Sequence, residues 1–243
     1  MKSSSGSQSL YVEGLGTLVV HRNTRAKRLT FRVRHNKLHL TAPTYTSERD
    51  MYQAASSLRE RLKSLLTENR TPLIDLDFKI KTDYFELEVR EGTHNKFYAQ
   101  SQLGKLLLIS PQACVFADAK LQAWLYKVII EALRRNAKLI LLPMLYQLAR
   151  KYQISYHQVK INTSRGRWGS CSGKKNINLS AYLMLLPKHL IEYVLLHELA
   201  HTLEMNHGAQ FWKVLNQLTE GKAKTLDKEL KQYKTSLFTN QPT

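Results

Sequence analysis

The chain has 243 residues, 43% of them hydrophobic and 23% charged, so it can bury a substantial core as one large or two small domains. No apolar run approaches the roughly 18 residues of a membrane span, and the first ten residues lack the apolar segment of a secretory signal. Only Cys114 and Cys171 are present, far apart, which argues against a disulfide framework. Together these features predict a soluble, cytoplasmic protein with no membrane partner.

The formal net charge is +18 and the isoelectric point is near 9.9. Such a charge attracts polyanions, including nucleic acid, ribosomes, nucleotides and acidic substrates. A second interpretation is that the basic surface only keeps the protein soluble. The composition does not decide between them.

Residues 1–15 are predicted to be a disordered start. Between Gly16 and Ala42 apolar and polar residues alternate, which predicts a half-buried hairpin with a basic outer face. Six basic residues make this face the candidate contact for a polyanion or nucleic acid: Arg22, Arg25, Lys27, Arg28, Arg32 and Arg34. A solvated sheet face is the alternative, because no nucleic-acid-binding motif accompanies them.

The remaining pattern predicts an α+β fold. Ser47 or Thr46 is a candidate N-cap for one helix over residues 46–68, and strand patterns follow up to Ser110. A long helix is predicted from about 117 to 152, kinked or split at Pro143. We therefore expect a β-rich N-terminal region over residues 16–115 and a C-terminal domain over residues 116–243.

Short antiparallel strands are predicted around Val159 to Ile161, within Ser164 to Ser172 and around Asn176 to Ser180, directly before an apolar helix. An edge strand of such a sheet is a candidate for pairing with an extended peptide substrate. Gly166 and Gly169 predict backbone that closely approaches a ligand or that helix.

The apolar helix contains His197-Glu198-Leu199-Ala200-His201. Residues at i and i+4 share a helix face, so the two imidazoles point the same way, and Glu198 leans toward the open side. This is the layout of a hydrolytic zinc site. The pattern also arises by chance on core helices, but His and Glu are costly in so apolar a helix unless they are paired or metal-bound.

A third histidine, His207, follows six residues after His201. Three protein ligands with a fourth position left for water are typical of catalytic zinc, whereas structural zinc sites are closed. We therefore predict a Zn²⁺ cofactor held by His197, His201 and His207, with Glu198 as the catalytic residue.

Four further residues are weaker candidates for supporting the ligands or binding substrate: Arg167, Glu204, Asn206 and Trp212. Each has a structural alternative. Glu204, Asn206 and Trp212 could equally be cap or packing residues, and Arg167 could form a structural salt bridge.

Several segments resemble the YgjP-like metallopeptidase domain family: Arg25-Ala26-Lys27-Arg28-Leu29, Arg167-Trp168-Gly169-Ser170-Cys171, Asn176-Ile177-Asn178-Leu179, His197-Glu198-Leu199-Ala200-His201, Asn206-His207 and Phe211-Trp212. The similarity covers about Val19 to Tyr233. The resemblance implies a zincin-like metal site formed by the three histidines, with SprT-like and Wss1-like peptidases as relatives. The family members are usually named as metal-dependent hydrolases, and at least one is described as a UTP pyrophosphatase. A metzincin is excluded, because Glu204 stands where a metzincin has glycine and no Met-turn follows.

Three functions therefore remain open. The first is a zinc-dependent peptidase acting on peptide or protein, with Glu198 as general base. The second is a nucleoside triphosphate pyrophosphatase acting on a nucleotide such as UTP, which the positive charge and Arg167 favour. The third is a nucleic-acid-associated protein whose zinc is structural.

Overall fold

The computed structural model describes residues 8–34, 37–68, 72–235 and 237. The chain forms two compact units, Met1–Pro72 and Leu73–Thr243. The chain therefore divides after Pro72, and not between residues 115 and 116 as the sequence predicted. The reason is that the strands before residue 111 share one apolar core with the helices after it, including Leu87, Leu108 and Leu133.

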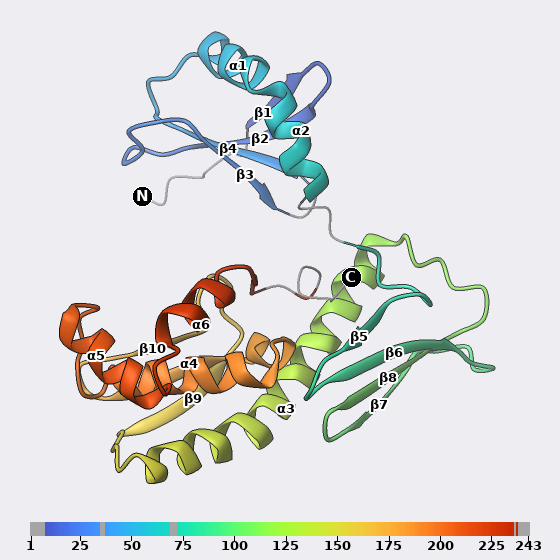
Figure 1. The fold of residues 1–243 in the computed structure, drawn as a ribbon. Helices are drawn as coiled ribbons and strands as arrows, with labels where there is room; N and C mark the ends of the chain where they lie inside the picture. The colour runs from blue at the N-terminus through green and yellow to red at the C-terminus, as the bar shows by residue number, and fades with distance from the viewer. Residues whose placement is uncertain (1–7, 35–36, 69–71, 236, 238–243) are drawn as a thin grey trace, which may run out of the picture. The chain divides into compact units, whose positions relative to one another are not determined.

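The N-terminal unit is a four-stranded sheet with two helices on one face (Figure 1). Its elements are β1 (Gln8–Val12), β2 (Gly16–Arg22), β3 (Thr30–Arg34), β4 (Lys37–Ala42), α1 (Glu48–Ser57) and α2 (Arg59–Glu68). The strand order is β1-β2-β4-β3. β2 and β4 are parallel, whereas β1–β2 and β3–β4 are antiparallel pairs.

Two predictions for this unit need correction. Residues 8–12, placed in the disordered start, form β1, because Leu10 and Val12 add their side chains to the core; residues 1–7 lie outside the described residues. The predicted helix over residues 46–68 is two helices. Ser47 caps α1 by accepting a hydrogen bond from the Asp50 amide, and α1 ends at Leu58, whose backbone leaves the helical conformation (φ −100°, ψ 12°).

The second unit combines two sheets with one long helix and a cluster of shorter ones. Its strands are β5 (Lys79–Lys81), β6 (Glu86–Glu91), β7 (Tyr98–Gln102), β8 (Lys105–Ser110), β9 (Gln158–Asn162), β10 (Gly169–Cys171) and β11 (Asn176–Ser180). Its helices are α3 (Ala119–Lys151), α4 (Lys188–Ala200), α5 (Ala209–Leu218) and α6 (Ala223–Leu230). A buried 3₁₀ turn, η1 (Ala181–Leu185), joins β11 to the approach of α4. The predicted α+β class is confirmed.

The sequence predicted a kink or a split at Pro143, and the long helix α3 continues through this residue without a split. Proline removes one amide donor, which would have bonded the carbonyl of Leu139 four residues earlier. Pro143 lies on the exposed side of α3, and Leu139 is 64% exposed. Water can therefore satisfy the carbonyl, and the buried side of the helix remains continuous.

The small sheet that precedes α4 has the order β10-β11-β9. β10 and β11 form the predicted antiparallel pair, but β9 and β11 are parallel. The chain reverses twice between β9 and β11, so β11 returns in the direction of β9. β10 is thereby left at the edge of the sheet.

Candidate metal centre

Helix α4 carries the histidine motif through the core of the second unit. It begins after Pro187, and its first amide, that of Lys188, donates a hydrogen bond of 2.7 Å to Oδ2 of Asp83. A carboxylate at this position satisfies an orphan donor and suits the positive end of the helix dipole. α4 packs against β10, α5 and α6 (Figure 1). The helix that carries the motif is therefore held by this strand and these two helices.

Three imidazoles converge at the C-terminal end of α4. Nε2 of His197 lies 3.2 Å from Nε2 of His201 and 3.1 Å from Nε2 of His207. His197 and His201 come from the helix and its C-cap, and His207 from the turn before α5. Ligand nitrogens of all three lie within 4.8 Å of one another.

This convergence fits a metal ion better than hydrogen bonding. One Nε2 carries either a single proton or a single lone pair, so that of His197 cannot make two good hydrogen bonds at once. Nitrogens bound to one tetrahedral ion at about 2.0–2.1 Å lie about 3.3 Å apart, close to the spacing observed. Among the residues that the structure describes, the group has three members, which leaves a coordination position open.

Backbone contacts and burial keep the imidazoles ready to bind a cation. Nδ1 of His201 lies 3.2 Å from the Glu204 carbonyl, which can only accept, so this nitrogen holds the proton and Nε2 keeps its lone pair. Burial, and then the neighbouring His201 and His207, lowers the pKa of His197 to about 3. Burial also lowers the pKa of His201. Both rings are therefore neutral at physiological pH.

Glu198 is a buried carboxylate next to this cluster. It is 4% exposed, and burial raises the pKa of its carboxyl to about 8. Its Oε2 has no hydrogen-bond partner among the described residues. The other oxygen packs against Gly169 of β10, where an added Cβ would lie 2.5 Å from Oε1. The predicted close approach of the backbone at Gly169 is thus confirmed, and the neighbour is Glu198 of α4. A Cβ added at Gly166 would meet nothing within 4 Å.

Phe211 forms the floor of the histidine cluster. Its ring centroid lies 5.0 Å from that of His197, 4.5 Å from that of His201 and 4.6 Å from that of His207, and the side chain is fully buried. The sequence predicts a helix over residues 208–218 that carries Phe211 and Trp212 against the site, and these ring contacts confirm it for Phe211. The signal for this contact is the apolar Phe211 at the start of an amphipathic helix directly after His207.

The four weaker candidates have different positions. Trp212 lies against the site, 6.5 Å from the His207 ring, with Nζ of Lys224 3.3 Å above its indole. Among the described contacts, the main-chain carbonyl of Glu204 reaches His201, and the Glu204 side chain does not. Asn206 accepts a hydrogen bond from Gly208 through its carbonyl, and its side chain is exposed. Arg167 is exposed, and within the described part of the chain it forms no salt bridge.

A family model described as "YgjP-like, metallopeptidase domain" matches residues 27–233. The chain belongs to this family. The match begins before β3 and ends after α6, so it includes parts of both units and every residue of the histidine cluster. Comparisons with curated proteins and with solved structures returned no match.

Family membership and the three clustered histidines together indicate a metal-dependent hydrolase. Within the residues that can be described, no helix combines the length and the apolar character needed to cross a membrane.

Proposed function

We propose that this protein is a zinc-dependent peptidase, with His197, His201 and His207 as the ligands and Glu198 as the general base. The proposal rests on the buried Oε2 of Glu198, which has no hydrogen-bond partner among the described residues. Glu198 directly follows His197, one of the three imidazoles that converge. Neutral nitrogen ligands with an open position suit Zn²⁺ in a catalytic site. When bound, the ion supplies Lewis-acid catalysis by polarising a carbonyl oxygen and making water more acidic.

Glu198 is suited to move the proton. Its Oε2 is unpartnered and faces no competing donor among the described residues, so it can accept a proton from the attacking water. The same oxygen then delivers this proton to the leaving amine. Burial raises the pKa of the Glu198 carboxyl, which favours its holding the accepted proton until the leaving amine takes it.

The edge strand β10 favours an extended peptide as the substrate. The Ser180 amide bonds the Trp168 carbonyl and the Ser172 amide bonds the Asn176 carbonyl, so hydrogen-bonded pairs occur at alternate positions. The main-chain groups of Gly169 and Cys171 therefore point away from β11, toward the free edge. A peptide strand added there lies beside Glu198, which packs against Gly169.

A nucleoside triphosphate pyrophosphatase is the second candidate. The net charge of +18 and the exposed, unpaired Arg167 shortly before β10 favour an anionic substrate. Release of pyrophosphate from UTP by metal-loaded protein, abolished by a chelator, would decide for it. A purely structural zinc is less well supported, because the histidine group has three described members and not four.

The test is the Glu198→Gln variant, compared with Glu192→Gln on the same helix. Gln keeps the shape of Glu198 but cannot accept the proton, so we expect metal content to be retained and peptide hydrolysis to fall about 10²–10⁴-fold. Glu192 lies on another, partly exposed side of α4 beside Lys188, and its variant should retain activity. Metal analysis and a peptide-library assay measure both. Undiminished hydrolysis in Glu198→Gln would refute the proposal.

A further inference from the structure

The sheet of the N-terminal unit has one face that its helices leave open. Side chains alternate along each strand, and Leu18, Val20, Leu38 and Leu40 point into the core with α1 and α2. The strand registers place the intervening residues together on the other face, and those whose side chains the structure describes are exposed or half-buried. This open face includes Tyr11, His21, Arg32, Lys37 and His39.

The open face carries the aromatic rings of Tyr11, His21 and His39. The rings of His21 and His39 are nearly coplanar, with centroids 5.2 Å apart and planes within 4°, and they meet edge to edge, with Nε2 of His21 2.9 Å from Nδ1 of His39. Tyr11, on the edge strand β1, is 67% exposed. A large aromatic side chain so exposed on a sheet gains little from folding. Such rings provide surfaces on which unpaired bases can stack.

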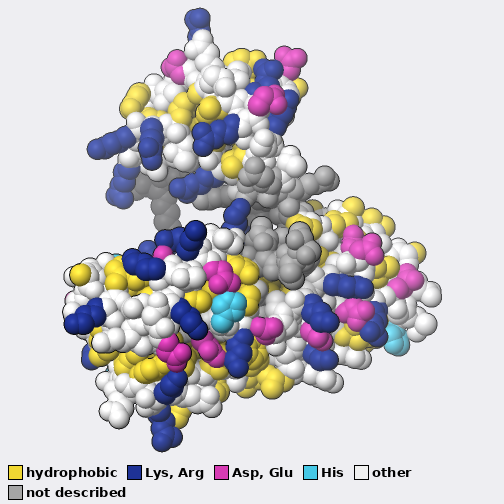
Figure 2. Space-filling model, in the orientation of Figure 1, with side chains coloured by type: hydrophobic (Ala, Val, Ile, Leu, Met, Phe, Trp, Pro, Cys, Tyr) yellow, Lys and Arg dark blue, Asp and Glu magenta, His cyan; other side chains and the backbone are white. Residues whose placement is uncertain are grey.

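The charge around these rings is of one sign. From Gly14 to Ser47 the sequence contains no Asp or Glu. Arg32 is the register partner of His39, and Lys37 begins the same central strand β4. The exposed residues Arg25, Lys27 and Arg28 follow in the β2–β3 connection, and Figure 2 shows Lys and Arg side chains gathered at this end of the unit.

Arg22 does not belong to this binding set, although it is part of the predicted basic cluster. Its Nη1 donates hydrogen bonds of 3.0 Å and 2.8 Å to the carbonyls of Thr44 and Thr46. Its guanidinium therefore ties β2 to the segment before α1. The basic cluster thus contains one structural residue, Arg22, and four residues that are exposed: Arg25, Lys27, Arg28 and Arg32.

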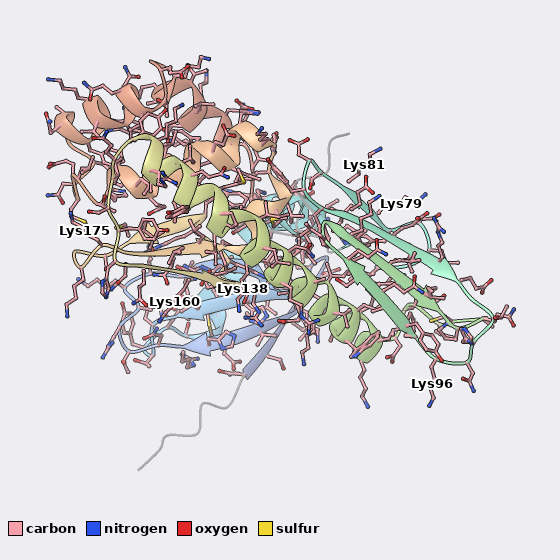
Figure 3. The ribbon with its side chains drawn as sticks, turned by 90° about the horizontal axis from the view of Figure 1, so that it is seen from below. Lys79, Lys81, Lys96, Lys138, Lys160 and Lys175 are labelled. Carbon is pink, nitrogen blue, oxygen red and sulfur yellow. The ribbon has the colours of Figure 1, made fainter. Side chains whose placement is uncertain are left out.

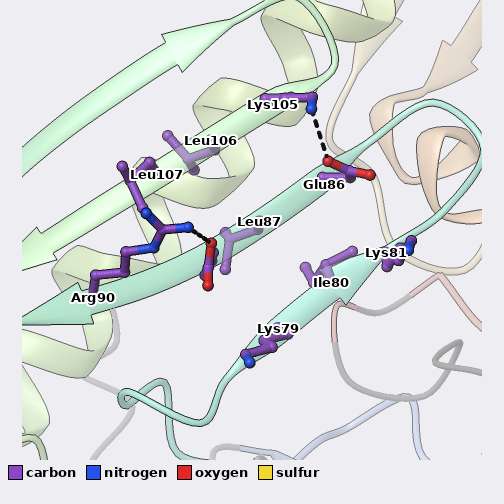
Figure 4. Close-up of a pocket in the computed structure, with 10 residues that line it drawn as sticks. Lys79, Ile80, Lys81, Glu86, Leu87, Arg90, Lys105, Leu106 and Leu107 are labelled. Atoms are coloured by element: carbon purple, nitrogen blue, oxygen red, sulfur yellow. Dashed lines mark hydrogen bonds and ion pairs between the residues drawn. The ribbon is translucent and has the colours of Figure 1, made fainter.

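The outer face of a sheet in the second unit also carries basic residues. The outer face of this sheet, β5-β6-β8-β7, has a hollow of about 440 Å³, and Figure 3 shows Lys79 and Lys81 on its edge strand. There the cations are offset by acidic neighbours. Lys105 pairs with Glu86 at 3.2 Å, and Arg90 pairs with Glu88 at 2.7 Å (Figure 4). On that face two of the cations are therefore paired with carboxylates, whereas the segment from Gly14 to Ser47 contains no acidic residue.

We propose that the open face of the N-terminal sheet binds single-stranded nucleic acid. Bases stack on Tyr11 and on the His21–His39 pair, and Arg32, Lys37 and the β2–β3 connection contact phosphates. Duplexes keep their bases stacked internally, so this face discriminates against them. The inference concerns a site in the first unit and does not rest on the proposed peptidase activity.

The test is fluorescence anisotropy of the full-length protein with fluorescein-labelled 12-nucleotide oligo(U) and oligo(dT), in EDTA, over a series of salt concentrations. We expect both strands to bind, with their ratio showing which backbone is preferred. Tyr11→Ala should weaken binding about tenfold at unchanged salt slope, whereas Tyr11→Phe retains it. Arg32→Ala should reduce the slope of log Kd against log salt by about 0.7, as for one lost phosphate contact.

Arg49→Ala is the matched control, because Arg49 is an exposed arginine on α1, which packs on the opposite face of the sheet. It should change neither affinity nor slope appreciably, and all variants should keep the melting temperature of the parent. The proposal is overturned by absence of binding at low salt, by equal binding of a duplex of the same length, or by equal effects of Arg49→Ala and Arg32→Ala. Unchanged binding in Tyr11→Ala overturns it as well.

Discussion

Gly169 has no side chain, and the carboxylate of Glu198 fills the space that a side chain would take. A Cβ built at Gly169 lies 2.5 Å from Oε1, 2.7 Å from Cγ and 2.8 Å from Cδ of Glu198. The whole carboxylate arm would have to move, and it is buried against the helix that holds the histidines. One missing methyl group thus sets the position of the proposed general base.

We therefore expect Gly169→Ala to lower the free energy of unfolding by about 1–3 kcal/mol, as overpacking does, and to reduce hydrolysis. Urea denaturation and a peptide-cleavage assay measure the two effects. Gly173→Ala is the control, since an added Cβ there meets nothing within 4 Å. Equal activity in both variants would show that Glu198 tolerates displacement.

His207 is the ligand candidate outside the helix, and its ring packs on Phe211 at 4.6 Å. His207→Ala leaves two nitrogens for the ion, so we expect zinc affinity to fall by more than the roughly 10–100-fold that loss of an outer partner costs. Competition with a zinc chelator measures the affinity. His157→Ala, at an exposed position, should leave it unchanged. Parental affinity in His207→Ala would remove this residue from the ligand set.

At the level of elements, helical periodicity was sufficient where the contacts are local. It predicted α3, whereas α4 was predicted from an apolar run that is too long for a typical strand. It joined α1 to α2, because the break at Leu58 leaves the apolar spacing intact on both sides. The parallel pairing of β9 with β11 has no sequence signal of its own, since strand direction depends on the path of the connection.

Pro143 offers a test of α3. Alanine restores an amide that can donate to the carbonyl of Leu139, and Pro143 is exposed, so the core is untouched. We expect Pro143→Ala to raise the free energy of unfolding by up to about 3 kcal/mol, the helix-propensity difference. Urea denaturation measures it, with Gln147→Ala on the same exposed side as the control. A destabilised Pro143→Ala variant would mean that the helix requires the distortion that proline imposes.

In the whole molecule, two separate cores carry different functions in our proposals. The histidine cluster packs within the larger core, and the sheet with the open basic face has its own. A ligand stabilises only the unit that binds it, by about 2.7 kcal/mol at a free concentration 100 times Kd.

We therefore expect zinc to raise the melting temperature of one calorimetric transition of the full-length protein and to leave a second unchanged. EDTA should reverse the shift. Leu40→Ala, in the fully buried core of the first unit, should lower only the zinc-insensitive transition and so assign it. If zinc instead raises the melting temperature of the transition that Leu40→Ala lowers, the metal binds in the first unit and not at the histidine cluster.

The sequence by itself determined the α+β class, the family resemblance that the family model confirms, and the grouping of His197, His201 and His207. These depend on short-range spacing, and a helix turns i and i+4 to one side whatever surrounds it. The tertiary structure decided that β10 is the strand that packs against Glu198, that the chain divides after Pro72, and that Arg22 is structural. These depend on contacts between segments far apart in the chain, or on the path of a connection, which periodicity does not encode.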